Sequence, residues 1–138
     1  MKALVHTGPM MLEYMDRADP VPGAGEVLVR VRAVAICGSD VHGYTGTTGR
    51  RIPPVIMGHE AAGVVEAAGP GAEAWVPATR VTFDSIVWCG DCPPCRAGHT
   101  NLCEVRQPFG VSTPAFRRDG AMAEYVVVPA RLLHRLPD

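Results

Sequence analysis

Four of the five cysteines in this chain of 138 residues lie within one short stretch. The first three are spaced C-x₂-C-x₂-C, and the fourth follows after seven further residues, which gives Cys89, Cys92, Cys95 and Cys103. Four thiolates can close a tetrahedral site around one zinc ion, and the glycines and prolines between them suit a loop that folds back on itself. Because such a site leaves no position for a substrate, the spacing predicts a structural zinc in a lobe over residues 88–104.

The same cysteines admit a second interpretation, an iron–sulfur electron carrier. Bacterial ferredoxins also begin with C-x₂-C-x₂-C, but their fourth cysteine comes after three residues and is followed by proline. Here the gap is seven residues, and Glu104 follows Cys103. The spacing therefore favours zinc. His99 lies within the lobe, but with four thiolates available we expect it to be a solvated loop residue.

The fifth cysteine, Cys37, begins a second group of candidate ligands. It opens the run C-G-S-D-V-H, and the run G-H-E, which contains His59 and Glu60, follows further along the chain. A thiolate, an imidazole and a carboxylate would leave the fourth position on zinc open, as in a catalytic site. A lone cysteine after a strand is also commonly a small core residue, so from the residues alone both interpretations stay open.

Three polar residues near Cys37 could support a catalytic site. The Ser39 hydroxyl and the His42 imidazole could pass a proton to solvent. The Asp40 carboxylate could orient His59 by accepting its free ring N–H. The second group of residues therefore contains both candidate ligands and candidate proton carriers.

Short strands must position these residues, since the chain contains 15 glycines and 13 prolines and no long amphipathic helix pattern. The clearest strand covers residues 26–36, where Val27, Val29, Val31 and Ala33 alternate with other side chains and predict one buried face. Residues 37–58 are expected to form a long loop with one helical turn over 39–43, capped by Ser39 or Asp40. Further strands are predicted over 2–6 and 11–15 (a hairpin), 61–68, 80–83, 86–88, 123–129 and 132–136. About seven short strands predict a mainly β domain.

The composition limits the class of protein. Hydrophobic residues make up 47% and charged residues 20%, which is typical of one globular domain of this length. The net charge of −1 gives no electrostatic reason to expect nucleic acid or a membrane surface as a partner. No apolar run approaches the roughly 20 residues of a membrane span, and the first residues lack the apolar core of a signal peptide. We therefore expect a cytoplasmic protein with reduced or metal-bound cysteines.

The motifs together resemble a known family. Their order and spacing are similar to the zinc-dependent medium-chain alcohol dehydrogenases over nearly the whole chain, in the runs G-E-V-L-V-R-V from Gly25, C-G-S-D-V-H, G-H-E-A-A-G-V-V, the cysteine lobe, and D-G-A-M-A-E-Y-V from Asp119. The resemblance implies that residues 1–138 are the N-terminal GroES-like catalytic domain, a partly open β-barrel with short helices and a zinc lobe. The run C-G-S-D-V-H is most similar to the polyol (sorbitol-type) branch.

The resemblance also implies roles for individual residues. Cys37 and His59 would bind a catalytic zinc, with Glu60 as a direct or occasional ligand, and the four lobe cysteines would bind structural zinc. An alcohol or polyol would be oxidised to a ketone or aldehyde through a zinc-bound alkoxide, with hydride passing to NAD or NADP. Ser39 would touch the substrate oxygen and start a proton relay toward His42. The parent protein is expected to be a homo-oligomer.

The resemblance further implies that parts of the enzyme lie outside this stretch. The family places a nucleotide-binding Rossmann domain and one further catalytic-zinc ligand after this domain, and neither is found in residues 1–138. We therefore expect these residues to be inactive alone and to hold zinc only weakly at Cys37. The alternative is a non-catalytic binding or assembly module whose fold is stabilised by the lobe zinc.

Two local features deserve separate interpretation. The family usually carries Gly-Asp-Arg-Val after the G-H-E strand, and here the run is A-T-R-V from Ala78, which calls the local turn into question. The run from Gly69 matches G-x-G-x-x-A, but a dinucleotide fingerprint needs a helix to open there and Pro77 comes too soon for one. We therefore expect a turn at Gly69.

Overall fold

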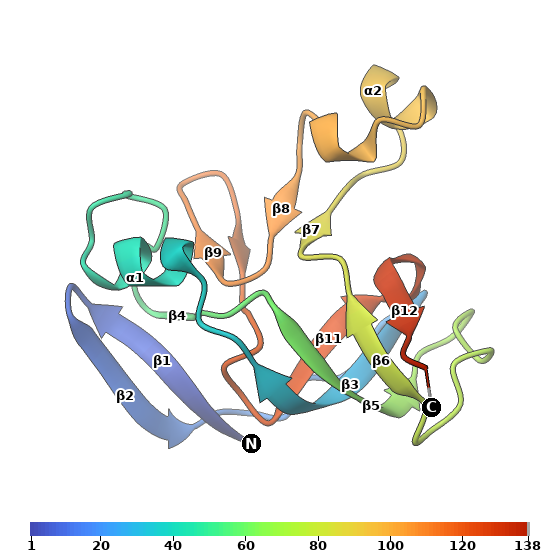
Figure 1. Ribbon diagram of the computed structural model, residues 1–138, viewed down its shortest axis with the longest axis horizontal. Helices are drawn as coiled ribbons and strands as arrows, with labels where there is room; N and C mark the ends of the chain where they lie inside the picture. The colour runs from blue at the N-terminus through green and yellow to red at the C-terminus, as the bar shows by residue number, and fades with distance from the viewer. Residues whose placement is uncertain (138) are drawn as a thin grey trace.

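The computed structural model describes residues 1–137, which form a mainly β domain (Figure 1). The prediction of a mainly β fold is confirmed. No helix among these residues is long and apolar enough to cross a membrane. Within this range the elements are β1 (Lys2–Gly8), β2 (Met11–Asp16), β3 (Glu26–Val34), α1 (Gly38–Tyr44), β4 (Val55–Ile56), β5 (Ala61–Ala68), β6 (Arg80–Phe83), β7 (Ile86–Val87), α2 (Pro93–Arg96), η1 (Thr100–Leu102), β8 (Gln107–Pro108), β9 (Val111–Ser112), β10 (Arg117–Arg118), β11 (Tyr125–Pro129), η2 (Ala130–Leu132) and β12 (Leu133–Arg135).

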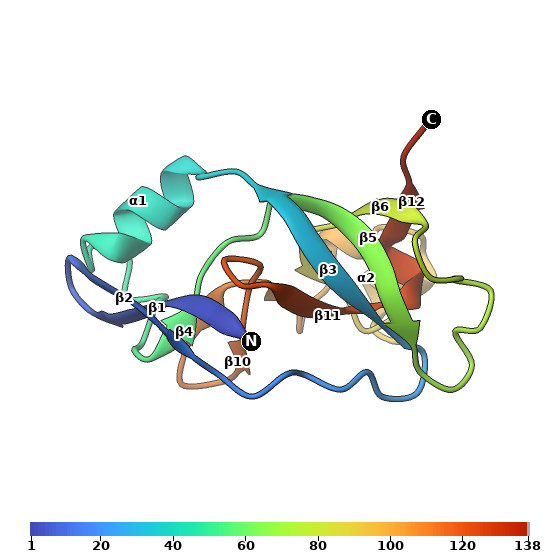
Figure 2. The same cartoon turned by 90° about the horizontal axis from the view of Figure 1, so that it is seen from below.

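A five-stranded antiparallel sheet in the order β11-β3-β5-β6-β12 holds the main core. Figure 2 shows β3 and β5 side by side along the length of this sheet. Val29 of β3 lies between Val65 of β5 and Val126 of β11, and all three side chains are buried. Within the described residues, the edge strands β11 and β12 each pair with one neighbour in this sheet and not with each other. The sheet therefore does not close on itself, and the barrel is partly open, as expected.

The buried face of β3 is shorter than its sequence pattern predicts. Val27 and Val29 are buried, but Val31 is only half-buried and Ala33 is exposed. The pairing of β3 with β5 shifts register between Val31 and Ala33, and the strand ends at Val34 instead of Ile36. The irregularity marks the point at which the strand leaves the core, since Ala33 beyond it is exposed.

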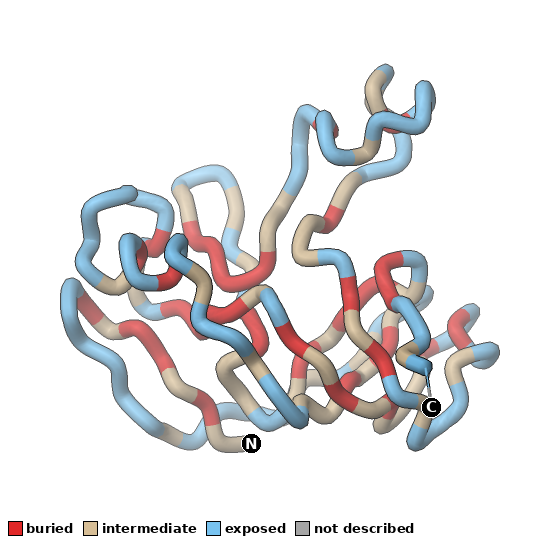
Figure 3. The backbone as a smooth tube through the Cα atoms, in the orientation of Figure 1, coloured by how far each residue is buried: buried red, intermediate tan, exposed pale blue. Residues whose placement is uncertain are grey.

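A smaller sheet, in the order β2-β1-β4, covers the other end of the domain. The predicted hairpin of β1 and β2 is present, and the paired residues run from Lys2 with Asp16 to Gly8 with Met11. On one face Ala3 and Val5 pack with Ile56 of β4. Figure 3 shows buried residues along β1 and the strands of the main sheet, whereas β2 is almost entirely exposed.

The cysteine-rich stretch projects from the sheets on a short two-stranded stalk (Figure 1). Strand β7 pairs with β8, and α2 and η1 lie between them in sequence. The predicted loop thus contains a short helix, α2, with prolines at its start, where proline is favoured because its missing N–H needs no partner.

Four two-residue strands, β4, β8, β9 and β10, were also absent from the prediction.

Helix α1 follows directly after Cys37. The predicted helical turn over 39–43 extends from Gly38 to Tyr44. The expected cap was wrong: the N-cap residue is Cys37, and Asp40 lies three residues into the helix, where its carboxylate accepts the backbone N–H of Cys37 at 3.1 Å. This bond satisfies a donor at the helix start, as in a capping box.

Candidate metal sites

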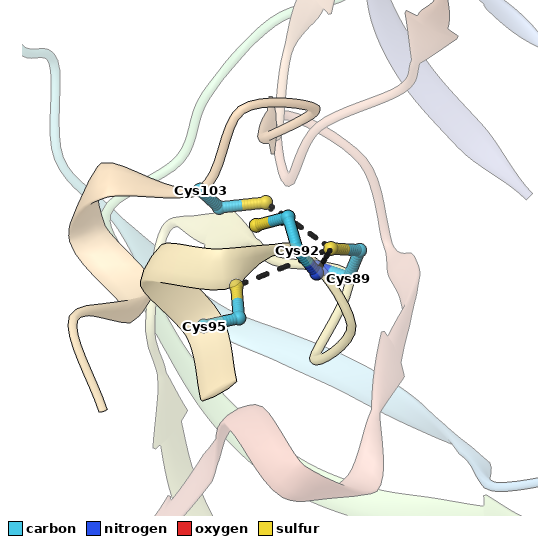
Figure 4. A group of neighbouring side chains, drawn as sticks. All are labelled: Cys89, Cys92, Cys95 and Cys103. Atoms are coloured by element: carbon cyan, nitrogen blue, oxygen red, sulfur yellow. Dashed lines mark hydrogen bonds between the residues drawn. The ribbon is translucent and has the colours of Figure 1, made fainter. Parts of the chain in front are cut away.

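The four lobe cysteines converge on one point (Figure 4). Their sulfur atoms all lie within 4.8 Å of one another, and none of them forms a disulfide. The Sγ of Cys89 lies 3.6 Å from that of Cys103 and 4.0 Å from that of Cys95. Zinc–sulfur bonds of about 2.3 Å in a tetrahedron place the sulfurs about 3.8 Å apart, so these four thiols fit a zinc ion.

Backbone N–H groups around the lobe stabilise negative charge on sulfur. The Sγ of Cys89 accepts the N–H groups of Asp91 and Cys92 at 3.3 and 3.4 Å, and these bonds lower the pKa of the Cys89 thiol to about 6. Burial instead raises the pKa of Cys95 to about 12. A buried thiolate at Cys95 therefore needs a cation beside it, which is what a metal ion supplies. His99 is exposed and lies outside this ligand group.

Cys37, His59 and Glu60 form the second group with metal-ligand chemistry. One donor atom from each lies within 4.8 Å of the others. Cys37 follows the end of β3, and His59 and Glu60 precede the start of β5. These two strand ends are neighbours in the sheet, since Val34 pairs with Ala61 and the Ala35 N–H donates to the Glu60 carbonyl at 2.8 Å. The antiparallel pairing therefore brings distant segments of the sequence together.

Asp40 contacts both Cys37 and His59 of this group. Its side chain is 1% exposed, and one carboxylate oxygen binds the Cys37 N–H. The other oxygen, Oδ1, lies 3.5 Å from Nδ1 of His59 and 3.5 Å from Nη2 of Arg51. Because Nδ1 faces Asp40, the second ring nitrogen of His59, Nε2, faces the opposite side, where a metal would need it.

The charges of this group are coupled through Asp40. Burial raises the pKa of Asp40, but His59, the Cys37 N–H and Arg51 outweigh burial and the net pKa is lowered. The Asp40 carboxylate raises the pKa of His59. The backbone N–H and hydroxyl of Ser39, followed by His59, lower the pKa of the Cys37 thiol. The site thus favours a carboxylate at Asp40 and thiolate character at Cys37.

Arg51 is a residue of the site that the sequence interpretation missed. It is 8% exposed although it lies in the predicted loop, and its guanidinium pairs with Asp40. A Cβ atom at Gly43 of α1 would lie only 2.5 Å from Cγ of Arg51. The glycine therefore leaves the space through which Arg51 passes the helix. An arginine beside a second, exposed arginine gives no signal in the sequence that it is buried.

A close approach of two backbone segments fixes the turn before His59. Gly58 has a φ of +89°, and a Cβ at Gly120 would lie 2.1 Å from the Gly58 carbonyl oxygen. The N–H groups of Ala121 and Met122 donate to the carbonyls of Gly58 and Met57, both at 2.9 Å. Only glycine at 120 allows this contact, so the G-H-E turn and the D-G-A segment are packed as one unit.

A cavity of about 610 Å³ opens beside His59 and Ser39. The Ser39 Oγ lies 3.3 Å from Nε2 of His59, on the side of the ring away from Asp40. His42 is on the next turn of α1 and is exposed, and within residues 1–137 no hydrogen bond joins its ring to Ser39. The structure thus brings Cys37, Ser39, Asp40, His59 and Glu60 together but does not link His42 to them.

Comparison with known families gives a match over residues 23–138, to the model described as the alcohol dehydrogenase GroES-like domain. An L-threonine 3-dehydrogenase of Anaeromyxobacter sp. strain Fw109-5 is 45% identical over 143 residues, an alignment that covers 100% of this chain and 40% of the relative. The starvation-sensing protein RspB of Escherichia coli K12 is 39% identical over 100% of this chain and 39% of its own length. The chain thus spans about two fifths of these curated relatives.

A solved structure shares the fold closely. A protein of Escherichia coli CFT073 described as a short chain alcohol dehydrogenase (rspB), in complex with NADH, superposes with a TM-score of 0.90 at 40% identity, covering 100% of this chain and 39% of that one.

Proposed function

Because the chain belongs to the alcohol dehydrogenase GroES-like domain family, we propose that it is the catalytic domain of a zinc-dependent alcohol dehydrogenase. The observation that carries this proposal is the convergence of Cys37, His59 and Glu60 beside a cavity that also contains Ser39. A buried structural cysteine would need no such partners. The convergence therefore favours the catalytic interpretation of Cys37.

The second metal site would use the Cys37 thiolate, Nε2 of His59 and the Glu60 carboxylate. Zinc held there would supply a Lewis acid that favours loss of the proton from an alcohol. Asp40 Oδ1 faces Nδ1 of His59 at 3.5 Å, which favours a ring orientation that directs Nε2 to the metal position. The Ser39 hydroxyl, next to Nε2, is placed to accept the proton of a substrate hydroxyl. The further transfer of this proton from Ser39 toward His42 stays a prediction.

The lobe zinc would have a structural role, since its four thiolate ligands leave no open position. The nicotinamide cofactor, NAD or NADP, would be bound by a separate nucleotide-binding domain of a longer parent chain, as the greater length of the relatives and the NADH complex of one of them suggest. The substrate would be a small alcohol or polyol. The parent protein would be a homo-oligomer.

Cobalt(II) titration of the metal-free chain tests the two sites together, because cobalt bound to thiolates absorbs visible light. We expect one tight class from the four-thiolate lobe and one weaker class from the group with a single thiolate. Cys37→Ser should remove only the weaker class, and Cys103→Ser only the tight class.

The alternatives predict other results. If the chain is a non-catalytic binding or assembly module stabilised by the lobe zinc, Cys37→Ser should leave the cobalt titration unchanged. An iron–sulfur carrier predicts bound iron and sulfide in the purified chain before any cobalt is added. Either outcome would contradict the proposal.

A further inference from the structure

On the premise of the proposed function, we propose that the alcohol bound at this site carries an anionic group, a carboxylate or a phosphate, and that Arg50 and Arg106 bind it. The cavity beside Ser39 and His59 is lined by both of these arginines. A substrate hydroxyl near Ser39 and an anionic group near a guanidinium would therefore lie in the same cavity.

The charges that line the cavity leave a positive surplus. Three arginines line it, and Glu104 is the one carboxylate among the described lining residues. Arg51 is already paired with Asp40. Neither Arg50 nor Arg106 forms an ion pair with any residue from 1 to 137. Two unpaired guanidiniums against one carboxylate favour an anionic ligand.

Arg106 is held in place, and Arg50 is free. Nη1 of Arg106 donates to the carbonyl oxygen of Cys103 at 3.2 Å, which ties the side chain to the last ligand of the lobe. Its remaining N–H groups have no partner among the described residues. Arg50 is exposed, and its side chain makes no hydrogen bond there. A guanidinium presents its donors in a planar fork that matches the oxygens of a carboxylate or phosphate.

The other walls suit the carbon chain of such a substrate. Phe109, Val111 and Phe116 contribute apolar surface, and Thr48 and Thr113 contribute hydroxyls. Apolar walls with a few polar groups are typical of sites for small ligands. The lobe thus contributes to binding of the anionic group, because the carbonyl of Cys103 positions the Arg106 side chain.

Three six-carbon ligands of equal chain length test the inference: D-sorbitol, D-gluconate and D-sorbitol 6-phosphate. Each is titrated into the zinc-loaded, ¹⁵N-labelled chain, and the dissociation constant is taken from backbone and arginine Nε chemical shifts. We expect at least one anionic ligand to bind about tenfold more tightly than sorbitol, as one charge-assisted hydrogen bond provides. The tighter of the two anions identifies the group as a carboxylate or a phosphate.

Variants locate the effect. The double variant Arg50→Gln/Arg106→Gln should lose the preference for the anion, while the control Arg17→Gln, at an exposed arginine outside the cavity, should keep it.

Two results would overturn the inference: equal or absent binding of the anions, or a preference that survives in the double variant. Neither of these would affect the cobalt titration of the proposed metal sites, which contains no anionic ligand. Absence of the weaker cobalt class would contradict the proposed function. The anion preference is measured in a separate titration, so the failure of one claim can be told from the failure of the other.

Discussion

At the scale of single residues, Asp40 connects the parts of the candidate catalytic site. It contacts the Cys37 backbone, the His59 ring and the Arg51 guanidinium, and it is almost fully buried. A buried carboxylate is costly unless it is paired and hydrogen-bonded. The position of the two metal-facing side chains therefore depends on the pairing of Asp40.

We expect Arg51→Met to lower the free energy of unfolding by about 3 kcal/mol, because it leaves Asp40 buried without its permanently charged partner. The variant should also weaken the second class in a cobalt titration, since Asp40 no longer holds His59 in one orientation. Urea denaturation of the zinc-loaded chain measures the first effect.

The neighbouring residue provides the matched control. Arg50 is exposed and unpaired, so Arg50→Met should change the free energy of unfolding by no more than about 0.5 kcal/mol. Equal destabilisation by the two variants would show that the buried pair with Asp40 has no special role.

The ligand candidates could be found in the sequence, but their support could not. Cysteine, histidine and glutamate are few, and their spacing and resemblance to a family single them out as a set. Arg51 is one of 13 lysines and arginines, and its burial depends on the space beside Gly43, which only the folded chain shows. His42 was predicted from its residue type, and its exposure on α1 depends on how the helix packs.

At the scale of elements, the long strands were predictable, and of the two-residue strands only β7 was. Strand β3 alternates valine with other side chains, and β5 and β11 contain continuous short runs of small or β-branched apolar residues. Strands β8, β9 and β10 have only two residues each, too few for any period, and they form because distant segments are brought alongside. Tertiary contacts, not local sequence, decide such elements.

The turn between β5 and β6 shows the effect of one departure from the family pattern. Ala78 stands where the family usually has glycine, and its φ is +67°. The turn still forms, since the Ala78 N–H donates to the Val65 carbonyl at 2.8 Å. A residue with a Cβ pays about 1 kcal/mol of strain in this region.

We therefore expect Ala78→Gly to raise the free energy of unfolding by about 0.5 to 1 kcal/mol, because it relieves this strain. Ala74, which is exposed in the same loop and has no positive φ, is the matched control. Ala74→Gly should instead lower stability by a few tenths to 1 kcal/mol through the entropy of the unfolded chain. A loss of stability in both variants, measured by thermal unfolding, would contradict the strain at Ala78.

At the scale of the whole molecule, the two metal sites lie on different supports. The lobe projects on the β7–β8 stalk, whereas Cys37 and His59 lie at the ends of β3 and β5 in the main sheet (Figure 1). Removal of the lobe metal should therefore loosen the projection and leave the pairing of β3 with β5 in place. The side chain of Arg106, bonded to Cys103, connects the lobe with the cavity.

The central claim is that Cys37, His59 and Glu60 hold a metal ion of their own, and anomalous diffraction at the zinc absorption edge tests it most directly. We predict two peaks in crystals of the chain grown with excess zinc, one among the four lobe sulfurs and one in contact with Cys37 Sγ and His59 Nε2. A single peak in the lobe, with Cys37 and His59 bound to no metal, would contradict the account.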